Sequence, residues 1–302
     1  MKTHESATIG DCVRWAEHQL AAADVHFGHG CDNAADEAIW AALHVSGLIH
    51  LEYESVRREQ VTRKTAKKIR RLIKSRIQTR KPLAYLIREA WFAQLPFYVD
   101  DRAIVPRSHI GDLIEDGFSP WVSEKRVGAV LDLCTGSGCI AVALALRFPQ
   151  AAVDAADIDS NALEVARINI GYHDCDGRIR LVESNLFENI EDKRYDLIVS
   201  NPPYVNENEL PDLPHEYRYE PQIALTGGDD GLDIVRRILA QCSDYLSPHG
   251  HLVMELGDSA QTLENAFPDV PFLWLTSKSG QSVVTLLSAD TIKQFRGEFD
   301  SP

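Results

Sequence analysis

From residue 129 onward the chain repeats one pattern: a short apolar run, a turn, then a longer amphipathic stretch. This alternation predicts an α/β fold, with a parallel sheet and right-handed crossover helices on both faces. Strand-like runs occur at 129–133, 152–156, 179–182, 195–200 and 251–256, and helices are expected at 140–148, 161–170 and 232–245. Two further runs, 272–275 and 282–288, flank Gly280 and predict an antiparallel pair at the edge of the sheet.

The region before the sheet has a different pattern. Apolar residues recur at three- and four-residue intervals over 12–23, 34–51 and 62–77, which predicts helices. Aromatic and β-branched residues over 91–105 predict a hairpin that turns at Asp100-Asp101. The expected division is therefore a helical domain over 1–88, a connecting hairpin over 89–107 and an α/β domain over 108–302.

The first expected strand runs directly into CTGSG, which places Gly136 and Gly138 at a strand-to-helix turn. Missing side chains let a ligand approach the backbone there, although the same glycines can simply permit tight packing. The phosphate-binding form Gly-x-Gly-x-x-Gly is absent, and no P-loop lysine follows. A ligand without phosphate, such as S-adenosylmethionine, therefore fits this turn better than a nucleotide held by its pyrophosphate.

An acidic residue ends the second expected strand. Asp157 stands where an acid in this topology meets ribose hydroxyls, and Asp159 is a second candidate. Either carboxylate could instead cap the helix that begins near Ser160. Because Asp157 closes the strand, we favour it as the ribose ligand.

The fourth expected strand is followed by Asn201-Pro202-Pro203-Tyr204. Two prolines end a strand, so a rigid turn is one interpretation. An amide or amino nitrogen attacks a methyl group poorly, because its lone pair is delocalised. If the Asn201 side-chain oxygen and the Pro202 carbonyl each accept one N–H bond, electron density returns to that nitrogen and its developing charge is stabilised. Tyr204 could stack on the planar group. The motif therefore predicts methyl transfer to a planar nitrogen.

These segments resemble the glutamine-amide methyltransferase family, in which NPPY follows a Gly-rich DLCTGSG. The likeness covers nearly the whole chain, and the runs VPRSHIGDLI (105–114) and EYRYEP (216–221) resemble the branch that acts on ribosomal protein uL3. It implies a Rossmann-like class I S-adenosylmethionine-dependent methyltransferase domain over 108–302, with the N-terminal helices recognising the substrate. The release-factor branch, which usually reads Pro-Arg-Pro, is the nearest alternative.

The same resemblance implies the site residues. Catalytic roles fall on Asn201, Pro202, Pro203 and Tyr204. Cofactor contacts fall on Asp132, Cys134, Thr135, Gly136, Ser137, Gly138, Asp157, Asn185, Leu186 and Asn201. Three residues depart from the family pattern: Cys134 replaces a glycine, His109 a proline and Asn185 an aspartate near adenine. The Asn185 carbonyl could still accept from the adenine amine.

Charge is distributed unevenly along the chain. Residues 57–81, here called the basic stripe, hold twelve Lys/Arg and one acid, Glu59, for a net charge of +11 within a chain of −14, which leaves −25 elsewhere. An acidic body suits a basic ribosomal protein substrate and disfavours a nucleic-acid amino methyltransferase. The stripe could touch ribosomal RNA or be only a solvated helix face. A non-catalytic ribosome assembly factor also remains open.

Other features concern metal and location. The six cysteines show no zinc-ligand spacing, so no metal site is expected. Residues 1–11 lack the apolar core of a secretory signal, and no apolar run is long enough to span a bilayer. These observations predict a cytoplasmic protein.

Overall fold

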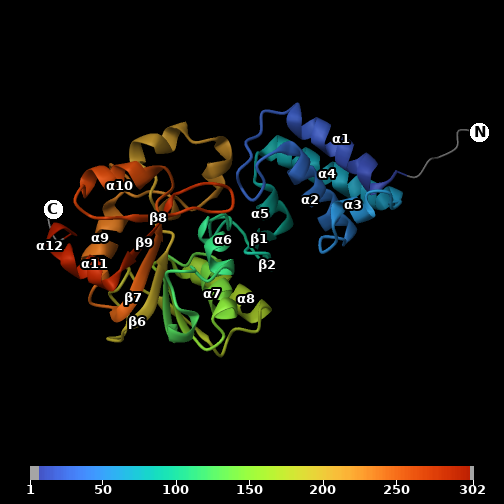
Figure 1. The fold of residues 1–302 in the computed structure, drawn as a ribbon. Helices are drawn as coiled ribbons and strands as arrows, with labels where there is room; N and C mark the ends of the chain where they lie inside the picture. Colours follow the sequence, from blue (N-terminus) through green and yellow to red (C-terminus); the bar gives the residue numbers. More distant parts are fainter. Residues whose placement is uncertain (1–6, 300–302) are drawn as a thin grey trace, which may run out of the picture. The chain divides into compact units, whose positions relative to one another are not determined.

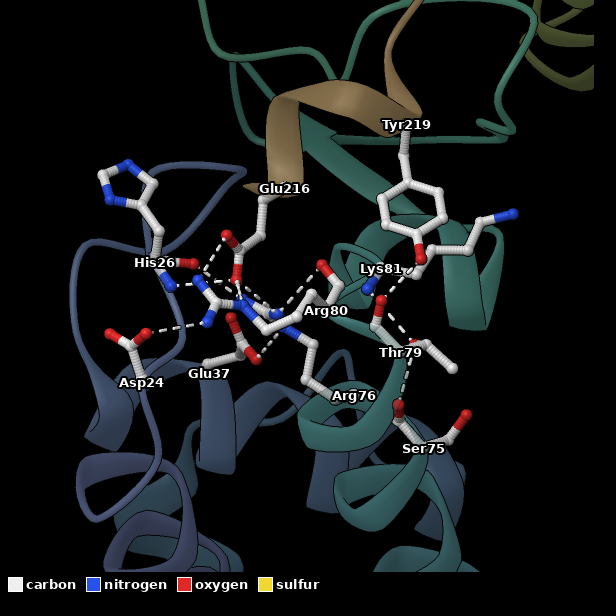
Figure 2. Close-up of polar contacts among 10 residues, drawn as sticks. All are labelled: Asp24, His26, Glu37, Ser75, Arg76, Thr79, Arg80, Lys81, Glu216 and Tyr219. Atoms are coloured by element: carbon white, nitrogen blue, oxygen red, sulfur yellow. Dashed lines mark hydrogen bonds and ion pairs between the residues drawn. The ribbon is translucent and has the colours of Figure 1, made fainter. Parts of the chain in front are cut away.

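The computed structural model describes residues 7–299. Contacts divide the chain into two compact units (Figure 1). A helical unit contains the chain up to residue 89 together with residues 214–219, and an α/β unit contains 90–213 and the chain from 220 onward. The sequence predicts 214–219 within the α/β domain, whereas its contacts group it with the helices. The sequence of 214–219 does not predict this grouping, because ion pairs with residues far away in the chain determine where the segment lies (Figure 2).

The helical unit contains α1 (Ile9–Ala21), α2 (Ala34–Ser46), α3 (Tyr53–Val56), α4 (Arg63–Thr79) and α5 (Leu83–Ile87). A capping box starts α1: the Thr8 hydroxyl accepts from the Asp11 N–H, and the Asp11 carboxylate accepts from the Thr8 N–H. The second helix ends before the expected residue 51, because Gly47 adopts a left-handed conformation with φ of 71°. On α4, Ile69 and Ile73 are fully buried while most of the cations face outward.

A hairpin opens the α/β unit, but its turn is not where the sequence predicts. Strands β1 (Ala90–Phe92) and β2 (Leu95–Phe97) pair across Ala93-Gln94, whose φ angles are 46° and 61°. Positive φ at both central residues is what a tight hairpin turn requires. The prediction of a turn at Asp100-Asp101 is therefore wrong. Asp100 instead accepts hydrogen bonds from Tyr98 and Arg102 within a loop beyond the hairpin.

The sheet confirms the predicted α/β fold. Its order is β5-β4-β3-β6-β7-β9-β8, parallel from β5 to β7 and antiparallel at the β7-β9-β8 edge. The seventh strand begins earlier than expected and ends before residue 256. The strand bounds are β3 Ala129–Leu133, β4 Ala152–Asp157, β5 Ile179–Glu183, β6 Tyr195–Ser200, β7 Leu246–Glu255, β8 Leu273–Leu275 and β9 Val284–Ser288.

Helices cover both faces of the sheet because consecutive strand residues point to opposite sides. Val130 belongs to the apolar cluster with α6 (Ile110–Glu115) and α7 (Cys139–Arg147), and α8 (Ser160–Tyr172) also contributes to it. Leu131 belongs to the opposite cluster, which includes residues of α9 (Asp233–Cys242), α10 (Ala260–Ala266), α11 (Ala289–Gln294) and α12 (Arg296–Phe299). Figure 1 shows these four helices on the other side of the sheet from α7 and α8. Strands β3, β4 and β6 are parallel, so their carboxyl ends lie on the same side of the sheet. The predicted motifs come together there. Among residues 7–299, no helix has the length and apolar character needed to cross a bilayer.

Candidate functional site

A cavity of about 360 Å³ lies at the carboxyl ends of the parallel strands. Its lining includes residues that follow β3, end β4 and follow β6, which is where ligands bind in open α/β sheets. Of the predicted site residues, the structure brings seven to the cavity wall: Cys134, Gly136, Asp157, Asn185, Leu186, Asn201 and Pro203.

The two glycines of the turn have different roles. A side chain at Gly136 would meet no atom within 4 Å, and this residue lines the cavity with φ of 54°. A Cβ at Gly138 would lie 3.0 Å from the Ala166 Cβ, with φ of 77°. Gly136 therefore leaves open space for a ligand, whereas Gly138 permits close packing of α7 on α8.

Four predicted cofactor residues do not line the cavity: Asp132, Thr135, Ser137 and Gly138. The Thr135 hydroxyl donates to the fully buried Asp132 carboxyl at 2.5 Å. Burial raises the pKa of Asp132 to about 7, against the hydrogen bond from Thr135. The backbone carbonyl of Ser137 accepts from the buried Asn169 amide at 2.8 Å. These contacts support the shape of the turn.

Asp157 connects the turn to the cavity. One carboxylate oxygen accepts from the Gly136 N–H at 2.8 Å and the other from the Asp159 N–H at 2.9 Å. Burial raises the pKa of the Asp157 carboxyl, and these backbone donors oppose the rise. Asp159 also lines the cavity, but its carboxylate caps α8 by accepting from the Asn161 N–H. The cap and the candidate ribose ligand are thus two different residues.

Arg237, a residue of α9, lies on the cavity wall although no sequence pattern predicts it there. Its guanidinium donates to the Asn185 side-chain oxygen at 2.9 Å, and the Asn185 amide donates to Glu188 at 2.7 Å. The Asn185 oxygen can still accept a second hydrogen bond. Arg237 lies on an amphipathic helix among other charged residues, so no local pattern distinguishes it from a solvated cation.

Two exposed isoleucines were also missed. Ile158 is 50% exposed and Ile223 is 52% exposed, and both line the cavity. Ile158 directly follows Asp157, so an apolar surface adjoins a carboxylate. Large exposed apolar side chains that face one cavity favour a flat apolar ligand group such as a purine ring. The position of Ile158 directly after the strand-ending acid was a signal that could have found it.

The NPPY motif divides between the cavity and the protein interior. Asn201 and Pro203 line the cavity, whereas Pro202 is buried and Tyr204 is not part of the lining. Among residues 7–299, none makes a hydrogen bond with the Asn201 side chain or with the Pro202 carbonyl. A half-buried carboxamide at a cavity, with its oxygen unused by the protein, is available to accept from a bound amide.

Tyr204 contacts Glu255, not the cavity, so the sequence prediction that it stacks on the reacting group lacks support. The Tyr204 hydroxyl lies 3.3 Å from the Glu255 carboxyl, and its ring fills the space where Gly257 would carry a Cβ. Burial and the nearby Glu255 carboxyl raise the pKa of Tyr204. The same carboxyl accepts from the Ser108 hydroxyl at 2.5 Å and the His109 N–H at 2.8 Å. Burial raises the pKa of Glu255, so this buried group links the NPPY and VPRSH segments.

A second buried carboxylate joins two of the segments that carry the resemblance. Glu220 accepts a pair of hydrogen bonds from the Arg107 guanidinium and one from the Val105 N–H at 3.1 Å. The next residue, Pro221, lines the cavity. Paired Arg–carboxylate bonds hold a fixed geometry, so VPRS positions the start of this part of the wall.

The residues present fit S-adenosylmethionine. Asp157 would hold the ribose hydroxyls, Ile158 and Ile223 would flank the adenine, and Gly136 leaves room beside the backbone. Carboxylates on the wall, Asp157 and Asp159, would repel a phosphate but suit a ligand that has none. No group of three His, Cys, Asp or Glu residues that could hold a metal occurs in the described part of the chain.

Comparisons with known proteins identify relatives of this chain. A family model described as "Methyltransferase small domain" matches residues 119–215. A ribosomal protein uL3 glutamine methyltransferase from Francisella tularensis subsp. tularensis is 41% identical over 97% of this chain and 93% of its own length. One from Bordetella pertussis is 44% identical over 95% of this chain and 97% of its own. The solved structure of a methyltransferase from Pyrococcus furiosus is 19% identical, covers 64% of this chain and 87% of its own, and has a TM-score of 0.46.

Proposed function

The chain belongs to the ribosomal protein uL3 glutamine methyltransferase family, and we propose that it transfers a methyl group from S-adenosylmethionine to the side-chain amide nitrogen of a glutamine in uL3. It is a methyltransferase with a class I fold and uses S-adenosylmethionine. The choice of uL3 rests on its relatives and on the acidic charge of the chain outside the basic stripe, which suits a basic ribosomal protein.

One observation carries the proposed chemistry: the Asn201 carboxamide lines the cavity and bonds to no described residue. Its oxygen would accept one N–H of the glutamine amide, and the Pro202 carbonyl would accept the other. Both acceptors would orient the nitrogen and stabilise positive charge that develops on it. S-adenosylmethionine supplies a methyl group already bonded to a positively charged sulfur leaving group. The nitrogen gains the methyl carbon and releases one proton to solvent.

The remaining motif residues would hold this arrangement. Pro202 and Pro203 fix the backbone after β6, and the Ser200 hydroxyl donates to the Leu133 carbonyl at 2.9 Å. That bond joins the ends of β6 and β3, which carry the two halves of the site. We assign Tyr204 to orientation of the motif through Glu255, in place of stacking on the substrate.

We also propose that the basic stripe contacts ribosomal RNA in an assembly particle, and that the enzyme acts in the cytoplasm, where such particles form. Arg57, Arg76 and Arg80 already pair with acids of the helical unit, so they do not serve this contact. The Arg70 guanidinium lies over the Trp15 ring. Exposed α4 cations that pair with no described acid are Arg63, Lys64, Lys67, Lys68, Arg71 and Lys74. Clustered cations without counterions favour phosphate contacts.

Labelled S-adenosylmethionine tests the activity. The chain is incubated with lysate from a strain that lacks it, and separately with purified uL3, release factors and ribosomal RNA. Label on a glutamine of uL3 is expected. Label on a release factor would assign the enzyme to the other branch, and label in RNA would refute a protein substrate. Label in none of them would favour a non-catalytic role.

A further inference from the structure

S-adenosylmethionine carries one anionic group, the carboxylate of its amino-acid tail. The residues that would hold its ribose and its adenine leave this group without a partner. A carboxylate loses water when it enters a cavity, and a cation or hydrogen-bond donors on the wall must compensate for that loss. Among the described residues, two cations line the cavity: Arg102, from the loop after β2, and Arg237, from α9.

Arg237 lies at the end of the cavity that would hold the adenine. Its guanidinium donates to the Asn185 side-chain oxygen at 2.9 Å. Asn185 follows β5, the strand at one edge of the sheet, and Asp157 ends β4, the next strand. Adenine and ribose bound at these two strands would direct the tail onward to β3 and its Gly-rich turn. Arg237 is therefore at the opposite end of the cavity from the expected position of the carboxylate.

The loop that carries Arg102 is bonded to the Gly-rich turn through Asn169, a fully buried residue of α8. The Asn169 oxygen accepts from the Tyr98 N–H at 2.7 Å, and its amide donates to the Tyr98 carbonyl at 2.9 Å and to the Ser137 carbonyl at 2.8 Å. Tyr98 begins the loop after β2, and Ser137 belongs to the turn after β3. Arg102 therefore lines the cavity at the end where the tail would lie.

Two acids hold the Arg102 guanidinium in place. Its Nε and Nη2 donate to the two oxygens of Asp100 at 2.9 and 2.8 Å, and Nη1 donates to Glu164 at 2.8 Å. The hydrogen bonds from Arg102 hold the pKa of the Asp100 carboxyl at about 2, so this pair stays charged. These contacts use three of the five N–H donors of the guanidinium. Donors that neither acid uses remain for a ligand, and the paired contact with Asp100 fixes their direction.

We propose that Arg102 binds the carboxylate of the cofactor's amino-acid tail, and that Asp100 and Glu164 orient its guanidinium for this contact. The tail also carries an ammonium group, so a cation flanked by acids presents both signs of charge to a ligand that has both. The proposal rests on the cofactor of the proposed function. It adds to that function the residue that distinguishes the complete cofactor from adenosine derivatives without a carboxylate.

Calorimetry with two ligands that do not react tests this assignment. One is S-adenosylhomocysteine, and the other is its decarboxylated form, which keeps the adenosine, the sulfur and the ammonium group. The wild type should bind S-adenosylhomocysteine about tenfold more tightly, because only this ligand forms the charged hydrogen bond. Arg102→Gln removes the cation, so its Kd values for the two ligands should lie within about twofold of each other.

Arg237→Gln is the matched control, because it makes the same substitution at the other cation of the cavity. It should weaken both ligands alike and keep the difference of about tenfold between them. The proposal is overturned if the wild type binds both ligands equally, or if the difference persists in Arg102→Gln. Loss of the difference in Arg237→Gln alone would assign the carboxylate to Arg237 and would overturn it as well.

Arg102→Gln leaves Asp100 without its cation, which could prevent folding. In that case the double variant Asp100→Asn/Arg102→Gln removes both charges and should show the same loss of discrimination between the ligands. A difference of about tenfold in the folded double variant would also overturn the proposal. These measurements need no methyl acceptor, so failure of the chain to methylate uL3 would refute the proposed substrate without changing their outcome.

Discussion

The side-chain oxygen of Asn185 accepts a hydrogen bond from the Arg237 guanidinium at 2.9 Å, on the wall of the cavity at the ends of the parallel strands. The family pattern has an aspartate at position 185, which would form an ion pair with the same arginine. In this chain the contact is a hydrogen bond between a charged and a neutral group, and Asn185 keeps one free lone pair toward the cavity. The departure therefore changes the strength of a contact without removing it.

Replacement of Asn185 should have a small effect on cofactor binding. Asn185→Ala removes one acceptor and should weaken binding by about 1 kcal/mol, whereas Asn185→Asp keeps the acceptor and should bind at least as tightly as the wild type. Calorimetry with S-adenosylhomocysteine measures both. Asn189→Ala, on the same loop but outside the cavity lining, is the control and should bind normally. A loss for Asn185→Asp as large as for Ala would contradict this role.

Asn201→Ala should reduce turnover by roughly 100- to 1000-fold while cofactor affinity changes little, because one preorganised acceptor is lost from the reacting amide. Asn201→Asp still accepts a hydrogen bond and should retain more activity than Ala. Single-turnover assays with uL3 provide the rates. Asn208→Ala, an exposed amide of the following loop, should be fully active. Normal turnover of a folded Asn201→Ala protein would refute the mechanism, as would a defect confined to cofactor binding.

Asp157→Ala should weaken cofactor binding by about 1.5–3 kcal/mol, the range for a hydrogen bond to a charged group. It should also lower the melting temperature, because the Gly136 and Asp159 N–H groups lose their acceptor. Asp159→Ala should cost about 1 kcal/mol of stability as a lost helix cap and leave affinity nearly unchanged. If calorimetry instead showed weaker cofactor binding for Asp159→Ala and normal binding for Asp157→Ala, Asp159 would be the ribose ligand.

Asp132 should make stability depend on pH. Its pKa is about 7 in the folded chain, compared with an ordinary value of 3.8, so the folded state holds a proton that the unfolded state releases. The contribution of Asp132 to stability should therefore be largest below the ordinary value, fall by about 1.4 kcal/mol per pH unit up to about pH 7, and change no further above it. Asp132→Asn should lack this contribution. Parallel unfolding curves for the two proteins between pH 5 and about pH 8 would show that Asp132 keeps an ordinary pKa.

Charge reversal on the basic stripe should affect recruitment and not chemistry. The triple change Lys67→Glu, Lys68→Glu and Arg71→Glu should raise the KM for a ribosomal assembly particle and leave kcat unchanged. The effect should be larger at low salt, because ions screen long-range attraction.

A charge-matched control reverses exposed cations of the α/β unit: Lys125→Glu, Arg167→Glu and Lys293→Glu. It changes the net charge equally but leaves the stripe intact, so its KM should change less. Equal KM shifts for the two triple variants would assign the effect to net charge. No shift at any ionic strength would make the stripe a solvated helix face.

The sheet and its motifs were predictable because both follow from local rules. Alternating apolar runs specify strands, and the Gly-rich turn and NPPY each follow a strand directly, so topology places them at one edge. Local rules also explain the failures. The turn at Ala93-Gln94 contains neither Gly nor Asn, so it carries no sequence signal for positive φ. The stacking role predicted for Tyr204 depended on the direction of one side chain, which Glu255 and Gly257 determine.

Contacts between residues far apart in the sequence could not be predicted, for a related reason. Arg237 reaches the cavity from α9 and Glu216 pairs with residues more than a hundred positions earlier, and neither fact is encoded near the residue itself. In the sequence, Arg76 looks like any other cation of the basic stripe. Its burial becomes evident only once Glu37 and Glu216 are seen on either side of its guanidinium.

Residues 214–219 belong to the helical unit although the segments on both sides of them belong to the α/β unit. This arrangement limits how the chain can be recombined with a relative. An exchange of the first 89 residues with those of a relative would bring in new partners for Glu216 while leaving Glu216 itself behind. The graft would succeed only where the incoming segment supplies cations equivalent to Arg76 and Arg80 at the same places. The N-terminal helical segment therefore cannot be exchanged by itself, and hybrid enzymes should be joined at two crossovers, with the second one around residues 214–219.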